Sequence, residues 1–141
     1  MGPETVRIGL VQMTCGANTA DNLDKAESGI RDCAKNGAQI ICLQELVGTL
    51  YFCHEESYDH FELAHASDGP TIERFQKLAK ELATVIIVPF FERRASGVYH
   101  NSAAVLDADG SHLGIYRKMH IPDDPGFLEK FYFTPGDLGF K

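Results

Sequence analysis

Residues 6–13 read VRIGLVQM and residues 39–45 read QIICLQE, and these two apolar runs decide the fold of the chain. The first run alternates apolar and polar residues and becomes continuously apolar around Val11, which predicts a buried strand. The second run is a short apolar strand that is followed at once by Gln44 and Glu45. The fold therefore depends on what joins these two strands.

The segment between the two runs predicts a helix. Asp21 or Asn22 is a suitable amino-terminal cap, and Asn36-Gly37 is a typical helix end. The apolar residues that fall on one helical face are Leu23, Ala26, Ile30, Cys33 and Ala34. A strand, a covering helix and a second strand form a β-α-β unit, which requires a parallel strand pair and predicts an α/β sheet.

The position of Glu45 in the predicted sheet makes it a candidate functional residue. In open α/β sheets, functional residues gather beyond the carboxyl ends of the strands, and Glu45 directly follows a run that should be buried. The alternative is a surface carboxylate that begins a loop. Spacing alone leaves both interpretations open.

The rest of the chain continues the α/β pattern. A short helix is expected over 58–66. A second helix is expected to begin near Pro70, and its apolar residues lie on one face that packs into the core. Residues 85–91 predict a buried strand, with an irregularity at Pro89 near its end. Residues 98–106 and 111–116 predict two strands, and the turn 107–110 between them ends in a glycine suited to positive φ.

Composition narrows the class of protein. The 141 residues fit one average domain, and the formal net charge of −7 gives no general attraction to nucleic acid or to anionic membranes. No targeting signal and no membrane-length apolar run is visible, so a cytoplasmic protein is expected. The four cysteines lack a CxxC pattern, and free thiols are the expectation.

Several further side chains are chemical candidates, each with a plain alternative. Lys118 follows a strand end and is suited either to stabilise an oxyanion or to be a surface charge. Glu129 lies among aromatic residues and is either functional or an exposed loop residue. The group of Cys53 and the histidines at 54, 60 and 65 matches no common zinc spacing, so neither a metal nor a cofactor is predicted.

Together these signals resemble one family. Residues 44–46 (QEL), 117–122 (RKMHIP) and 128–133 (LEKFYF) resemble the segments that hold the general-base glutamate, the catalytic lysine and the second glutamate of the nitrilase superfamily, the carbon–nitrogen hydrolases. They occur in the family's order, and the resemblance covers essentially the whole chain. It implies that Glu45, Lys118 and Glu129 are the catalytic residues.

The resemblance also implies a fold and a missing part. It implies a four-layer α-β-β-α sandwich of the nitrilase type, with residues 1–141 as the amino-terminal part of one domain of about twice this length. The family's cysteine nucleophile is expected beyond Lys141, and none of the four cysteines present occupies its place. This chain alone is therefore expected to be an inactive fragment, a truncated product or one piece of a split protein.

The substrate expectation comes from two further segments. Residues 51–53 and 124–137 (DPGFLEKFYFTPGD) resemble the enzymes of this family that convert N-carbamoylputrescine to putrescine, CO2 and ammonia in polyamine biosynthesis. The alternatives are a β-ureido acid or an ω-amide as substrate, or a fragment that acts only in assembly. Tyr51 is expected either to line the substrate pocket or to be a packed core tyrosine. The family resemblance also implies a homo-oligomer.

Overall fold

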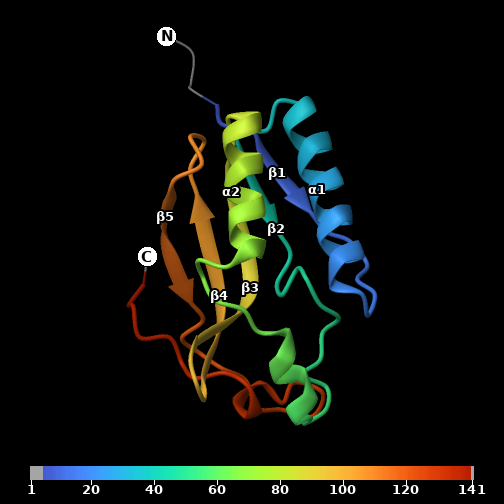
Figure 1. The fold of residues 1–141 in the computed structure, drawn as a ribbon, viewed down its shortest axis with the longest axis vertical. Coiled ribbons are helices and arrows are strands. Elements are labelled where there is room, and N and C mark those ends of the chain that lie inside the picture. The colour runs from blue at the N-terminus through green and yellow to red at the C-terminus, as the bar shows by residue number, and fades with distance from the viewer. Residues whose placement is uncertain (1–4, 141) are drawn as a thin grey trace.

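The computed structural model describes residues 5–140, which form one five-stranded sheet in the order β1-β2-β3-β4-β5. Strands β1, β2 and β3 are parallel neighbours, whereas β4 is antiparallel to both β3 and β5. Helices α1 and α2 lie on the same face of the sheet (Figure 1). In chain order the elements are β1 (Ile8–Val11), α1 (Thr19–Lys35), β2 (Ile40–Leu43), the 3-10 helix η1 (Tyr58–Leu63), α2 (Pro70–Leu82), β3 (Val85–Ala95), β4 (Val98–Leu106), β5 (His112–Arg117) and the 3-10 helix η2 (Glu129–Phe131).

The predicted β-α-β unit is confirmed, with a different helix start. Asn18 caps α1, because its side chain accepts hydrogen bonds from the backbone N–H groups of Ala20 and Asp21. The prediction of Asp21 or Asn22 as the cap was therefore wrong. Asn22 is instead buried and bonds the backbone of Gly16 through both its amide oxygen and its amide nitrogen. The expected end is correct, because Asn36 caps the helix and Gly37 follows with φ of 81°.

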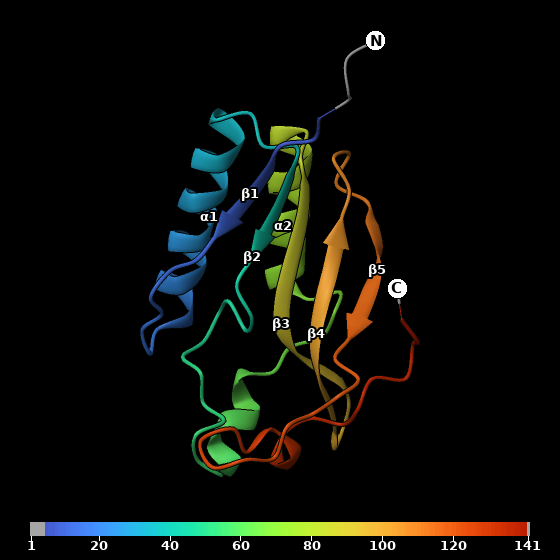
Figure 2. The same cartoon turned by 180° about the vertical axis from the view of Figure 1, so that it is seen from behind.

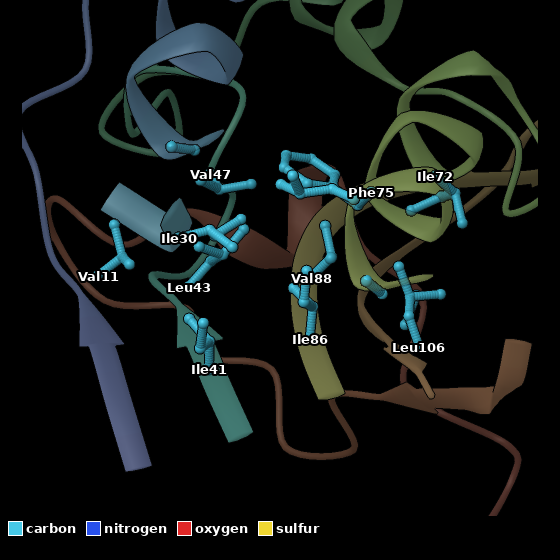
Figure 3. Packing of buried hydrophobic residues seen from close by; sticks show 14 of the residues in the cluster. Val11, Ile30, Ile41, Leu43, Val47, Ile72, Phe75, Ile86, Val88 and Leu106 are labelled. Carbon is cyan, nitrogen blue, oxygen red and sulfur yellow. The ribbon is translucent and has the colours of Figure 1, made fainter. Parts of the chain in front are cut away.

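One hydrophobic core joins the two helices to the sheet. Ile30 of α1 and Phe75 of α2 are fully buried, and they pack with Ile41 and Ile86 of the central strands. Figure 3 shows these side chains filling the space between the helices and the strands. Tightly packed apolar side chains of this kind supply most of the favourable free energy of folding. The helical face of the sheet is therefore complete.

Within residues 5–140, no helix covers the opposite face of the sheet (Figure 2). Ile8 and Leu10 of β1 are 61% and 76% exposed, so only one side of the strand that we predicted to be buried is buried. The strand register continues this face through Cys42 and Ile87 to Val105, which are only partly buried. The chain thus forms an α/β sheet with one helical layer, two of the four layers expected for the sandwich.

Pro89 does not disturb β3. It pairs with Ala103 in regular register, and the irregularity lies later, between Arg93 and Ala95. The Pro89 carbonyl accepts a hydrogen bond from Val47 N–H, so the backbone groups of Pro89 point to the side on which β2 has already ended. Because no strand partner is present there, the missing N–H of proline costs no ladder hydrogen bond. The predicted irregularity at Pro89 was therefore wrong.

A second, aromatic cluster closes the carboxyl edge of the parallel strands. Phe52 packs with Phe91, Tyr132 and Phe133, with ring centroids between 4.8 and 6.1 Å apart. The Tyr132 hydroxyl donates to the Glu55 carbonyl at 2.7 Å. The loop after β2 and the loop after β5 are thereby held together at the end of the sheet where η1 and η2 lie (Figure 1). Aromatic contacts fix both loops to the scaffold.

A buried ion pair joins the long hairpin strands to the end of the chain. Arg117 of β5 makes a two-pronged pair with Glu92 of β3, with N–O distances of 2.8 and 2.6 Å. Ser102 of β4 also donates to Glu92 at 2.6 Å. Arg117 further bonds Asp137 at 2.9 Å, and Arg94 pairs with the other oxygen of Asp137. The Arg117–Glu92 pair is buried, whereas the side chains of Asp137 and Arg94 are about half exposed.

None of the helices in residues 5–140 has both the length and the apolar character needed to cross a membrane.

The Asp137 pair predicts a pH dependence of stability. Hydrogen bonds from Arg94 and Arg117 lower the pKa of Asp137 to about 2. A depressed folded-state pKa stabilises the fold above the unfolded pKa of about 3.9, and this contribution is lost as the pH falls from about 4 to about 2. In urea unfolding, Asp137→Asn should therefore have a lower midpoint than the wild type at pH 6, and the difference should shrink below about pH 4 and become small near pH 2. Asp123→Asn is the control, because the Asp123–Lys130 pair spans 4.0 Å. A difference that persists unchanged to pH 2 would contradict the assignment.

The open sheet face predicts self-association of the 141-residue chain. An apolar face and an unpaired edge strand favour contact between copies. We expect the isolated chain to sediment as oligomers or aggregates, and Ile8→Thr with Leu10→Thr to shift it toward the monomer. Tyr58→Ser is the control, because Tyr58 is just as exposed but lies on η1, away from the sheet. A monodisperse wild-type monomer in analytical ultracentrifugation would refute the prediction.

Candidate functional site

Three charged residues that are far apart in the sequence meet in one network. The ammonium Nζ of Lys118 lies 3.1 Å from Oε1 of Glu45 and 2.8 Å from Oε2 of Glu129. These are the three residues for which the family resemblance implies catalytic roles. The structure thus brings all three together, with the lysine between the two carboxylates.

The sheet topology explains why Glu45 and Lys118 are neighbours. Glu45 lies two residues after the end of β2, and Lys118 directly follows β5. Strand β5 is antiparallel to β4, which is antiparallel to β3, so β5 runs in the same direction as β3 and β2. Their carboxyl ends consequently lie at the same edge of the sheet. This edge is where α/β proteins usually place their functional groups.

The backbone turns sharply at Glu45. The next residue, Leu46, has φ of 51°, a left-handed conformation that is uncommon for a residue other than glycine or asparagine. Leu46 is also buried within the aromatic cluster, which holds it in place. Strained backbone of this kind persists only where the surroundings enforce it, and it is frequent at functional sites.

Glu129 is a buried carboxylate with both oxygens occupied. Its residue is 2% exposed, and its Oε1 accepts a hydrogen bond from the Tyr51 hydroxyl at 3.0 Å while Oε2 accepts from Lys118. The alternative of an exposed loop residue was therefore wrong. The backbone that leads to Glu129 is fixed too, because Leu128 N–H donates to the Cys53 carbonyl at 2.7 Å. A buried carboxylate requires such partners.

Lys118 carries its charge in a partly buried position. Burial alone would lower the pKa of Lys118, but the hydrogen bonds and negative charges of Glu129 and Glu45 outweigh it and raise that pKa above its ordinary value. The lysine is therefore an ammonium ion throughout the neutral range. A fixed positive charge at the edge of a sheet is suited to stabilise a developing oxyanion.

Tyr51 reaches the same network. Its hydroxyl is committed to Glu129, and burial together with that carboxylate raises the pKa of Tyr51, so the phenol stays protonated and donates. Its ring lies against Phe127 with the centroids 6.0 Å apart. Tyr51 thus contacts the charged network directly, and its role in lining a substrate pocket remains a prediction.

Asn101 belongs to the same network, although its role was not predicted from the sequence. Its amide Nδ2 donates to Oε1 of Glu45 at 2.6 Å. The sequence does contain a feature that marks this position, because His100, Asn101 and Ser102 are consecutive polar residues inside a strand that is otherwise mainly apolar. Consecutive polar residues in a buried strand need partners, but the pattern does not name them.

Three of the four cysteines have thiols with raised pKa values. Cys53 is fully buried, and burial together with the charges of Glu129 and Glu45 raises the pKa of its thiol to about 12. Burial also raises the pKa of Cys15 and of Cys42. Because the thiolate is the reactive form, these three thiols are poor nucleophiles at neutral pH. In the part of the chain that the structure describes, no three His, Cys, Asp or Glu side chains are grouped as metal ligands would be.

Comparison with known proteins places the chain in a family. Residues 7–141 match the carbon-nitrogen hydrolase family. The chain is 53% identical over 137 residues to an N-carbamoylputrescine amidase from Oryza sativa, a match that covers 96% of this chain and 45% of the relative. It is 45% identical over 137 residues to a citrullinase from Francisella tularensis, covering 96% of this chain and 48% of the relative. The chain therefore spans about half the length of the curated relatives it matches.

The comparison with solved structures agrees with the sequence comparison. The crystal structure of a carbon-nitrogen hydrolase from Helicobacter pylori superposes with a TM-score of 0.89 at 43% identity, covering 96% of this chain and 46% of that one. An amidase from Nesterenkonia sp. has the same fold, with a TM-score of 0.73 at 22% identity over 94% of this chain and 48% of that one. Sequence and structure lead to the same assignment, and the chain belongs to the carbon-nitrogen hydrolase family.

Proposed function

We propose that the protein that carries this chain hydrolyses the C–N bond of a carbamoylated amine, with N-carbamoylputrescine as its substrate. The observation that carries the proposal is the Lys118 ammonium held between the carboxylates of Glu45 and Glu129. The identity of 53% to the rice N-carbamoylputrescine amidase supports the choice of substrate. The products are putrescine, CO2 and ammonia.

The proposed reaction uses each charged residue once in acylation. Glu45 takes the proton of a cysteine thiol, and the thiolate attacks the ureido carbonyl. Lys118 stabilises the oxyanion of the tetrahedral intermediate, and Glu129 orients Lys118. The C–N bond to the terminal amine breaks, and the proton held by Glu45 passes to that amine, which leaves as ammonia. A carbamoyl group remains on the cysteine sulfur.

Water completes the turnover. Glu45 removes a proton from water, the resulting hydroxide attacks the carbamoyl carbon, and the C–S bond breaks. The proton returns to the thiolate, and the released carbamic acid separates into putrescine and CO2. The nucleophile in this proposal is a cysteine outside residues 1–141, because the family resemblance implies that position and none of the four cysteines present occupies it.

A second substrate has a specific observation in its favour. The citrullinase from Francisella tularensis is 45% identical over the same length, so a different ureido compound fits the chain nearly as well. β-Ureido acids and ω-amides are further alternatives within the family. The different-class alternative is a fragment that acts only in assembly.

We extend the main proposal to a single domain whose amino-terminal part is residues 1–141, in a cytoplasmic homo-oligomer that works in polyamine biosynthesis.

The test compares the chain alone with the chain joined to the carboxyl-terminal half of the rice relative. Ammonia release is measured with N-carbamoylputrescine, citrulline and β-ureidopropionate. We expect no release by the chain alone and release from N-carbamoylputrescine by the joined protein. Activity of the chain alone would contradict an external nucleophile. A folded joined protein that prefers citrulline would replace the substrate, and one inactive on all three compounds would overturn the proposal.

The role of Lys118 predicts a large loss of rate. In the joined protein, Lys118→Met should lower kcat by about 100-fold or more, because the oxyanion loses its positive charge. Lys130→Met is the matched control, since its side chain is 62% exposed and only loosely paired with Asp123. It should keep kcat within about twofold of the unmodified protein. Equal rates for the two variants would exclude Lys118 from the chemistry.

A further inference from the structure

The side chain of Asn101 and its backbone act on two different members of the network. Its amide Nδ2 donates to Oε1 of Glu45 at 2.6 Å. Its backbone carbonyl accepts the N–H of Lys118 at 2.8 Å. A single residue of β4 therefore bonds both the carboxylate and the backbone that carries the ammonium group.

Asn101 itself is rigidly held. It is 5% exposed and lies in the middle strand of three, in register with Phe91 of β3. Its neighbour Ser102 is in register with Arg117 of β5. A buried strand residue with partners on both sides has little freedom to move. The amide must also face Glu45 with its nitrogen, because the amide oxygen would repel a carboxylate.

The two oxygens of Glu45 are consequently unequal. Oε1 accepts from both Asn101 and Lys118, whereas no group in residues 5–140 donates to Oε2. The Glu45 side chain is 49% exposed, so residues 5–140 do not enclose its carboxylate. A carboxylate held by one oxygen presents the other in a fixed direction, and such preorganisation is worth large factors in rate.

We propose that Asn101 is a positioning residue that fixes Oε1 of Glu45 and so leaves Oε2 as the atom that accepts the proton from the nucleophile. The inference rests on the proposed function, because it assigns a geometry to the base of that reaction. In the acylation step, the S–H bond of the thiol breaks and the proton moves to Oε2, while the sulfur lone pair forms the bond to carbon. In the second step, Oε2 receives the proton of water in the same way.

Two variants of Asn101 test the proposal in the joined protein. Asn101→Asp keeps the shape of the side chain but replaces the donor with an oxygen that repels Glu45. Asn101→Ser removes the amide without adding charge. Each should lower kcat by about tenfold or more and change KM by less than about threefold, because substrate binding is retained while the base is misplaced.

Ser102→Ala is the matched control. Ser102 is the next residue of the same strand, is equally buried and also donates to a carboxylate at 2.6 Å, but its partner is Glu92. It should lower the thermal midpoint and keep kcat within about twofold. Wild-type kcat in both Asn101 variants, or an equal loss of kcat in Ser102→Ala, would overturn the inference alone. A joined protein without activity on any ureido substrate would overturn the proposed function and this inference with it.

Discussion

The burial of the Glu129 carboxylate is the constraint on which the site depends. An ionised carboxylate away from water costs several kcal/mol unless hydrogen bonds and an opposite charge compensate it. Tyr51 and Lys118 supply that compensation, one at each oxygen. Because they come from the loop after β2 and from the end of β5, the compensation is possible only when both loops have reached their folded positions. The charged site can therefore form only when the two loops are folded.

The sheet meets this constraint through its strand directions. Two successive reversals, at the β3–β4 and β4–β5 connections, return the chain to the direction of β2. The ends of β2 and β5 then lie at one edge, with β3 and β4 between them. An odd number of reversals would have placed Lys118 at the opposite edge, far from Glu45. The long hairpin strands and the buried Arg117–Glu92 pair therefore do more than stabilise the sheet, because they fix the strand that ends at Lys118.

The sequence predicted the elements better than it predicted the contacts. Hydrophobic periodicity identified the β-α-β unit, α2 and the hairpin strands, because a helix or strand that is buried on one face has apolar residues at a regular spacing. The grouping of Glu45, Lys118 and Glu129 followed from a family resemblance, since contacts between residues 73 positions apart leave no local pattern. Asn101 and the left-handed Leu46 were missed for the same reason, because their meaning depends on a partner or a packing environment distant in sequence. The exposed side of β1 was missed because an apolar strand looks the same whether its second face is covered or open.

The charged network forms independently of any cover on the open face of the sheet. Each hydrogen bond that defines the network, from Asn101 through Glu45, Lys118 and Glu129 to Tyr51, is made within this chain. The core between the helices and the sheet is also closed without further residues. Covering the open face would therefore add stability through apolar burial without having to create the arrangement of base, ammonium and second carboxylate. It follows that the electrostatic arrangement on which the proposed chemistry relies is already in place within residues 5–140.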